Sequence, residues 1–177
     1  MGQKFAAYNS QGAIVAYYDS DDSPPPASAT TIEITDSEWL ICLATPGYTV
    51  VDNAIVAPPA PTAAQIEAQA LVQSAQAALV AGLQVSSTGT PALNGTYAID
   101  QFSQMDIIAI ETGLNAGKGF PAGTTTLNYP DTTGLLHNFS EANFTDFAAV
   151  VRDYVYALKS VMAGQSSSLP SAAVTIA

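Results

Sequence analysis

Two clusters of proline constrain this chain more than any other feature of its sequence. Three prolines occupy residues 24–26, and Pro58, Pro59 and Pro61 form the second cluster. Proline fixes φ and has no backbone N–H, so neither a helix interior nor a central strand can run through these clusters. Residues 62–83 follow the second cluster and contain no proline, and their first glycine is Gly82. The clusters therefore predict a small folded segment before residue 58 and a different structure after it.

Residues 1–57 predict a small β-rich domain with the element order ββ-β-α-ββ. Its strand candidates are aromatic and β-branched runs at 5–8, 13–19, 32–34, 48–51 and 54–56. Asn and Gly in the loop after the first run are typical of a hairpin, and Asp52-Asn53 predicts a second hairpin turn.

One helix is expected within this domain, after the third strand. Thr35 and Glu38 match a capping box, in which Thr accepts from a free backbone N–H and Glu reaches back to another. We expect this short helix to bury Trp39, Leu40 and Leu43.

Residues 58–88 are expected to form a proline-rich linker and an Ala/Gln-rich connecting helix over 62–83. Glu67 is the only charged residue of this helix. Written as a heptad repeat, its seam is apolar at the ends and filled with glutamine in the middle: Ile66, Gln69, Gln73, Gln76, Val80 and Leu83. This pattern fits a self-associating coiled coil, but it equally fits a helix that lies on its own domain. Ser, Thr and Gly at 85–91 have the composition of a linker.

Residues 89–164 predict an α+β domain with two main helices. The first helix follows Asp100 and runs to about residue 112, and the second follows Ser140 and spans about 141–163. We expect the first to bury a face with helical spacing: Phe102, Met105, Ile108 or Ala109, and Thr112. The second is the strongest element of the chain and is expected to bury Phe144, Phe147, Val151, Val155 or Tyr154, Leu158 and Met162. Residues 165–177 predict a flexible Ser/Ala-rich tail, with an edge strand at 173–177 as the alternative.

Charge and composition argue against several classes of function. Four Lys and Arg against 15 Asp and Glu give a net charge of −11, so nucleic acid and anionic membranes are poor partners. One histidine, His137, and one cysteine, Cys42, are too few for a soft metal site. No signal peptide, membrane span, nucleophile elbow or cofactor loop is recognisable. We therefore expect no cofactor, no metal and no enzymatic activity.

The tyrosines are compatible with a surface for contact with other proteins. Neighbouring residues of a strand point to opposite faces, so Tyr17 and Tyr18 cannot both lie in the core. One of them is expected to be exposed or covered by another chain. The candidate partner-contact residues are Tyr17, Tyr18, Ile66, Gln69, Gln73, Gln76 and Val80.

The first half of the chain resembles the tail-fibre assembly proteins of bacteriophages. In that family a strand pair, a proline-containing loop, the motif I-x-I-[ST]-D-x-E-W and a proline-rich hairpin end precede an Ala-rich helix. The matching residues here are Ile32, Ile34, Thr35, Asp36, Glu38, Trp39, Pro58, Pro59, Pro61 and Thr62. The second half, from LNGTYAIDQFSQMDIIAIETGL to NFSEANFTDFAAVVRDYVYALKSVM, is similar to a domain of unknown function often appended to phage tail proteins.

The resemblance implies a protein that helps a long, β-rich, trimeric fibre to fold and assemble, and it brings no catalytic residues. It implies contact with a tail fibre or neighbouring tail subunits, in the host cytoplasm during assembly or in the virion tail, and association with further copies of the chain remains open. The family helix is usually charged after the prolines, whereas this one carries glutamines. Transient chaperone and virion structural subunit therefore both remain open. The alternative is a carbohydrate- or receptor-binding module that stacks sugars on Trp39 or the tyrosines.

Overall fold

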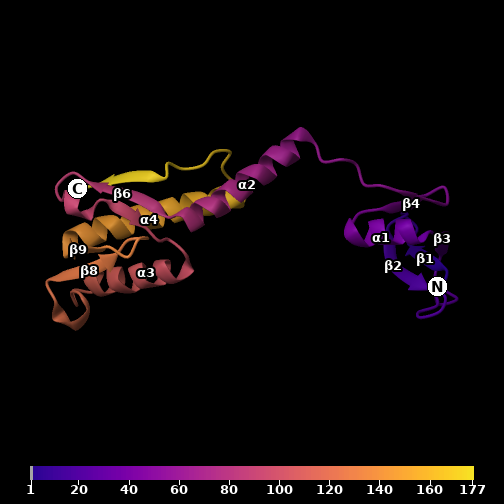
Figure 1. The fold of residues 1–177 in the computed structure, drawn as a ribbon, viewed down its shortest axis with the longest axis horizontal. Helices are drawn as coiled ribbons and strands as arrows, with labels where there is room; N and C mark the ends of the chain where they lie inside the picture. Colours follow the sequence, from indigo (N-terminus) through magenta and orange to yellow (C-terminus); the bar gives the residue numbers. More distant parts are fainter. Residues whose placement is uncertain (1) are drawn as a thin grey trace. The chain divides into compact units, whose positions relative to one another are not determined.

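The computed structural model describes residues 2–177 and has a mixed α+β architecture. It contains four α-helices and ten strands in four small sheets, as drawn in Figure 1. The chain divides at Pro61 into two compact units, which we call the N-terminal unit and the C-terminal unit, the latter comprising Thr62–Ala177. None of the helices in residues 2–177 combines the length and the hydropathy needed to cross a bilayer.

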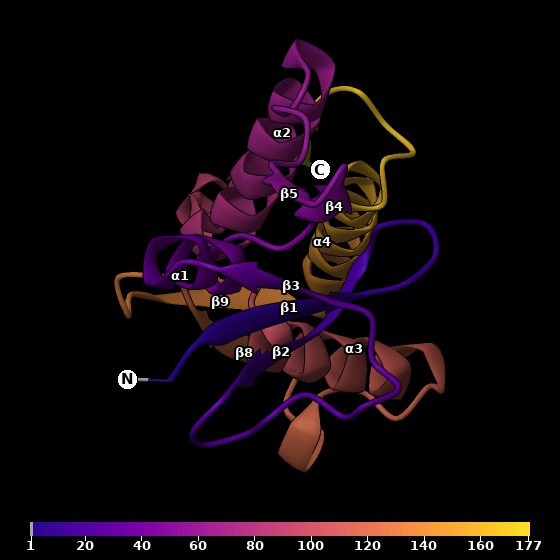
Figure 2. The same cartoon turned by 90° about the vertical axis from the view of Figure 1, so that its right-hand side faces the viewer.

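The N-terminal unit is built on a three-stranded antiparallel sheet. Its strands are β1 (Lys4–Tyr8), β2 (Ile14–Asp19) and β3 (Thr31–Ile34), in the order β2-β1-β3. A separate hairpin pairs β4 (Thr49–Val51) with β5 (Ala54–Val56). Figure 2 shows the three strands side by side with helix α1 (Asp36–Ala44) next to them. The order ββ-β-α-ββ is the one that the sequence predicts.

Local signals in the sequence explain the boundaries of these elements. Thr35 and Glu38 form both hydrogen bonds of the capping box that begins α1. Asp52 and Asn53 both have positive φ, at 49° and 62°, as a tight two-residue hairpin turn requires. Gly12 has a φ of 79°, and a Cβ there would lie 2.4 Å from the carbonyl oxygen of Val50, so this close approach to β4 requires glycine.

Helix α1 does not bury the residues expected from its sequence. Leu40 is 65% exposed and Leu43 is also exposed, whereas Cys42 is buried and Trp39 is half-buried. The reason is geometrical: in nine residues only one face meets the sheet, and Trp39 and Cys42, three apart, occupy it. The small core of this unit consists of Ala6, Ile32, Ile34 and Val50, with Tyr8, Ile14, Tyr17, Trp39 and Ile55 packed against it.

Trp39→Ala is expected to lower the free energy of unfolding of the N-terminal unit by about 1.5–3 kcal/mol, the value of burying a large apolar side chain. The prediction is checked by urea unfolding followed by circular dichroism, because the substitution removes the fluorophore. Leu40→Ala is the matched control and should change stability by less than about 0.5 kcal/mol. A larger effect of Leu40→Ala would contradict the observed orientation of α1.

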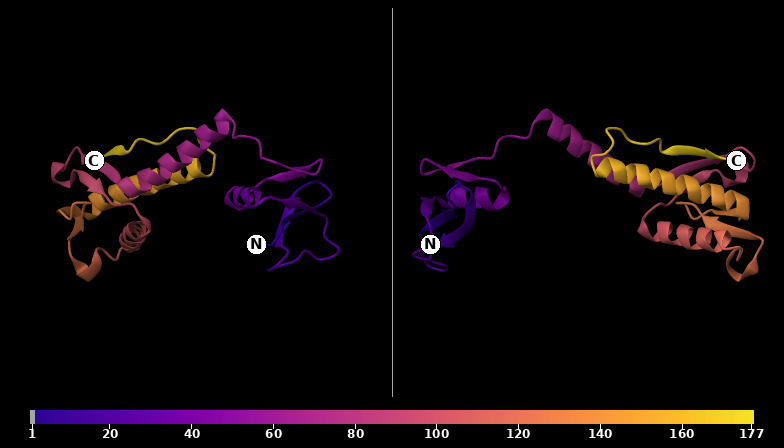
Figure 3. Two further views of the ribbon diagram at one scale, coloured as in Figure 1. Left: turned by 45° about the vertical axis from the view of Figure 1, so that its right-hand side comes forward. Right: turned by 180° about the vertical axis from the view of Figure 1, so that it is seen from behind.

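The C-terminal unit is organised around its longest helix, α4 (Glu141–Met162). Helix α2 (Ala63–Ala81) runs alongside α4 in both Figure 1 and Figure 3, and α3 (Gln101–Asn115) packs on another side of it. The eight buried residues of α4 are Phe144, Phe147, Ala148, Val151, Tyr154, Val155, Leu158 and Val161. This confirms five of the predicted positions, including both alternatives at 154 and 155, while Met162 lies only at the edge of the core.

Two small sheets complete this unit. One has the order β10-β6-β7, formed by β10 (Ala173–Ile176), β6 (Leu83–Ser87) and β7 (Gly95–Tyr97). The other pairs β8 (Thr126–Pro130) with β9 (Leu136–Ser140). Short 3-10 turns at Pro91–Leu93 and Pro121–Gly123 lie in the connections.

The expected linker and tail both contribute strands to the first of these sheets. Strand β6 is its central strand, and β10 pairs with it in parallel. The Ser/Thr-rich composition hides an alternation in which Leu83, Val85 and Ser87 are buried. The Ser87 hydroxyl donates to the carbonyl of Ala177 at 2.7 Å, which ties the tail to β6. Residues 85–87 of the expected linker are therefore part of a strand. The edge-strand alternative at 173–177 is confirmed for Ala173–Ile176.

Candidate functional site

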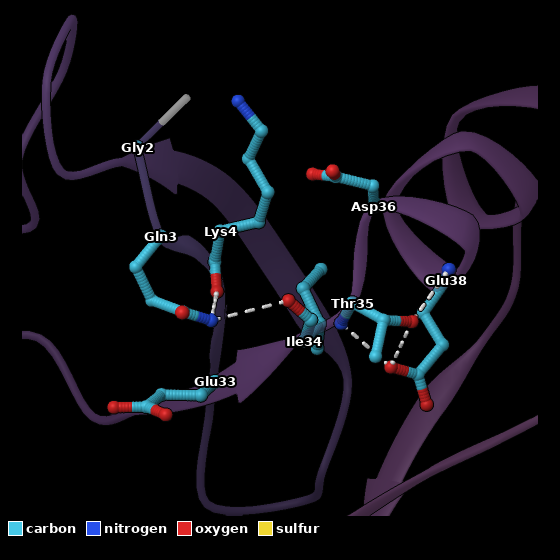
Figure 4. A pocket seen from close by; sticks show the side chains of 8 residues that line it. All are labelled: Gly2, Gln3, Lys4, Glu33, Ile34, Thr35, Asp36 and Glu38. Atoms are coloured by element: carbon cyan, nitrogen blue, oxygen red, sulfur yellow. Dashed lines mark hydrogen bonds between the residues drawn. The ribbon is translucent and has the colours of Figure 1, made fainter.

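A shallow pocket in the N-terminal unit, drawn in Figure 4, collects polar side chains from the start of β1, the end of β3 and the first turn of α1. Its lining residues are Gly2, Gln3, Lys4, Glu33, Ile34, Thr35, Asp36 and Glu38. In Figure 4, Lys4 and Asp36 extend along one side of the pocket, and Glu33 points away from them.

Several of these polar groups already serve the local fold. The backbone N–H and the hydroxyl of Thr35 each donate to the Glu38 carboxylate at 2.8 Å, and these hydrogen bonds lower the pKa of Glu38. The Gln3 amide donates to the carbonyl oxygens of Lys4 and Ile34, both at 3.4 Å. The arrangement holds β1, β3 and α1 together and presents no nucleophile beside a base.

Lys4 forms an ion pair with Asp19 of the neighbouring strand and also lies over Trp39. The hydrogen bond between Lys4 and Asp19 raises the pKa of Lys4 and lowers the pKa of Asp19. The Lys4 ammonium lies 5.2 Å from the centre of the Trp39 ring, and the ring of Tyr17 meets Trp39 edge-on at 5.5 Å. These contacts occupy the Trp39 ring, so it is a poor platform for stacking a sugar.

The acidic loop after β2 does not gather ligands for a cation. Asp19 accepts from Lys4 and, at 2.8 Å, from the backbone N–H of Asp21. Within residues 2–177 no group of three or more His, Cys, Asp or Glu side chains is placed to hold a metal ion. Cys42 is a buried free thiol whose pKa is raised by that burial.

His137 is buried in the C-terminal unit and serves as a bridge between segments. Its Nδ1 lies 2.6 Å from the carbonyl oxygen of Ala92, so it donates there, and its Nε2 lies 3.3 Å from Oδ2 of Asp131. The other oxygen of Asp131 accepts from the hydroxyl and N–H of Thr133 and from the N–H of Leu135. These contacts tie β9 to the turn at residues 131–134 and to the turn before β7, which is a structural role.

The stability of the C-terminal unit should fall in acid because of Asp131. Hydrogen bonds, chiefly from the Thr133 hydroxyl and also from His137, lower the pKa of Asp131 to about 2. A lowered folded-state pKa means that its stabilisation is present above the unfolded value, near 4, and is lost as the pH falls from about 4 toward 2. Asp131→Asn should flatten this part of a plot of unfolding free energy against pH. An equally steep plot for the variant would contradict the assignment.

The two candidate tyrosines lie on opposite faces of the N-terminal sheet. Tyr17 is opposite Ala6 in the strand register and packs against the small core, and burial raises its pKa. Tyr18 is opposite Phe5 on the other face and is half-buried. Both side chains are half-buried, and Tyr18 is the one that lies on the face away from this core.

The candidate residues of α2 all lie on its outward face. We call Ile66, Gln69, Gln73, Gln76 and Val80 the α2 seam, and each of them is exposed. Val80 is 87% exposed. The opposite face packs against α4 and the core through Leu71, Ala75, Ala78 and Leu79. Leu83 does not belong to the seam, because Gly82 ends the helix and Leu83 is buried in β6.

Helix α3 exposes the face that was expected to be buried. Phe102 is 81% exposed, Met105 60% and Ile108 58%, and we call these three residues the α3 stripe. Ile107 is buried instead, with Ile110 and Leu114 packed against the core. The helix therefore carries two apolar faces, and one of them faces solvent.

Sequence reasoning missed the α3 stripe as a surface because it assigned those residues to the core. A signal was available, since Ile107, Ile110 and Leu114 also recur at helical spacing. Two competing apolar stripes on one short helix indicate that one of them meets something other than the core of the domain.

No protein-family model, curated protein or solved structure matches this chain. Its function is therefore inferred from its own motifs and surfaces.

Proposed function

We propose that this protein is a bacteriophage tail protein that acts by protein–protein contact, either as an assembly chaperone of the tail fibre or as a fibre-associated subunit. The observation that carries the contact role is the α3 stripe, which places three large apolar side chains on the outside of a helix. Large aromatic and apolar side chains without charge are typical of the cores of protein interfaces.

The charge of the chain supports the same proposal. Only 11% of its residues are charged, compared with about 25% in a typical soluble domain. Leu40, Ile41 and Leu43 add an exposed apolar group on α1, within the segment that resembles fibre assembly proteins. A partner that covers such surfaces removes apolar area from water at little cost in desolvated charge.

A tail-fibre partner is favoured by the motif residues of the N-terminal unit. Ile32 and Ile34 of the motif lie in its core, and Thr35 and Glu38 cap its helix. These four residues of the motif therefore fold together within one unit. Its polar pocket is assembled from residues of the same segment and holds no arrangement suited to catalysis.

Co-expression with the fibre protein encoded beside this chain tests the proposal. We expect a stable complex on co-purification, or a higher yield of soluble, trimeric fibre than without the protein. Mass spectrometry of purified virions then separates the two versions, since a structural subunit is present in the particle and a chaperone is absent. Fibre of equal yield and trimer content without the protein, no complex, and no chain in virions would together contradict the proposal.

A further inference from the structure

The α2 seam is the outward face of a helix whose opposite face is already packed. Leu71, Ala75 and Leu79 face α4 and the core, whereas every seam residue is exposed. Residues 62–70, at the start of the helix, are exposed on all sides. We propose that this seam binds the same seam of a second copy of the chain, as a parallel, in-register coiled coil. The proposal is independent of a role in phage assembly.

The spacing of the seam identifies the partner element as an α-helix. From Ile66 to Val80 the steps are three, four, three and four residues, an average of 3.5. This repeat keeps one face of a helix against a second helix as the two supercoil. On one side of the seam, Ala70 and Ala77 are exposed and small, so the two backbones can approach closely there. On the other side, Val72 and Leu79 are half-buried.

The absence of charge from the seam favours a second copy over a different protein. Coiled coils commonly select a foreign partner through complementary charges beside the seam. The only charged residue of α2 is Glu67, which lies about 100° around the helix from Ile66. The helix has no Lys or Arg that could pair with it across the seam. A molecule of net charge −11 repels its own copies over most orientations, but two neutral seams meet without that repulsion.

The glutamines make the seam complementary to itself in one register. A glutamine amide both donates and accepts, so Gln69, Gln73 and Gln76 can each pair with the equivalent residue of the second copy. A shift of one heptad would place Gln73 opposite Ile66 or Val80 and leave its amide without a partner. Polar residues in coiled-coil seams are known to select register in this way, at a cost in stability. A helix of 19 residues with three such layers should therefore associate weakly and reversibly.

Sedimentation equilibrium of the full chain and two seam variants tests the pairing. Gln73→Ile combined with Gln76→Leu replaces two amides by residues that favour parallel dimers, so the association constant should rise at least about tenfold. Ile66→Glu combined with Val80→Glu places like charges across the seam and should abolish association. Ser74→Glu, exposed on α2 but outside the seam, is the control and should behave as the wild type.

Cross-linking tests the register. Because the single native cysteine, Cys42, is buried, a cysteine introduced on α2 is the one that reacts. Gln73→Cys should form a covalent dimer on mild oxidation, and Glu67→Cys should form it much more slowly. The proposal is overturned if the association constant of the Gln73→Ile, Gln76→Leu variant is no higher than that of the wild type. It is also overturned if the two cysteine variants cross-link at the same rate.

Discussion

Replacing Phe147 with alanine is expected to lower the free energy of unfolding of the C-terminal unit by about 3–5 kcal/mol. The Phe147 ring is fully buried on α4. Its centre lies 4.8 Å from the ring of Tyr97, 5.2 Å from Phe139, 5.6 Å from Phe144 and 5.9 Å from Tyr129. Truncation therefore leaves a cavity between aromatic rings from four elements, which cannot collapse without moving β7, β8, β9 or α4.

Urea unfolding of the wild type and two variants measures this effect. Phe102→Ala removes the same ring from the α3 stripe, where it is 81% exposed, and should change stability by less than about 0.5 kcal/mol. Similar losses from the two substitutions would mean that α3 is rotated relative to the core, contrary to the structure.

Gly82→Ala is expected to cost about 2–4 kcal/mol, the sum of backbone strain and steric overlap. Gly82 ends α2 with a φ of 89° and a ψ of −177°, a backbone conformation that residues other than glycine rarely adopt. A Cβ there would lie 2.6 Å from the carbonyl oxygen of Tyr97. Either the end of α2 or strand β7 would have to move.

Gly134→Ala, in the same unit, is the control that measures the cost of backbone strain without steric overlap of the Cβ. Its φ is 85°, close to that of Gly82, but no atom lies within 4 Å of the position of a Cβ. We therefore expect a cost of only about 1–2 kcal/mol, from the backbone conformation alone. Thermal unfolding of both variants decides: equal losses would show that the close approach between Gly82 and β7 is not a constraint.

The elements that the sequence predicts well are those whose signals are local. Thr35 and Glu38 lie within one turn of each other, and the Asp52-Asn53 turn depends on two adjacent residues. Helix α4 combines a cap at Ser140 with a long apolar periodicity. In each of these elements, a few neighbouring residues favour the observed local structure and disfavour the alternatives.

The elements that the sequence predicts poorly depend on partners distant along the chain. Strand β6 and strand β10 pair although they lie about 90 residues apart, and a Ser/Thr-rich segment gives no local sign of that pairing. The choice between the two apolar faces of α3 is likewise made by α4 and not by α3 itself. Of the candidate contact residues, the α2 seam emerges as one continuous exposed face, whereas Tyr17 and Tyr18 lie on opposite faces of a sheet.

The most direct test of a contact function is the binding of purified tail-fibre protein to the wild-type chain and to an α3-stripe variant with Phe102, Met105 and Ile108 all changed to alanine. Tyr156→Ala on α4, which is also an exposed large side chain, is the control. Interface anchors typically contribute about 2 kcal/mol or more, so calorimetric titration should show saturable wild-type binding that the variant weakens by at least about 30-fold. Tyr156→Ala should bind as the wild type does. No binding by the wild type, or equal binding by the wild type and the stripe variant, would contradict a fibre contact made through α3.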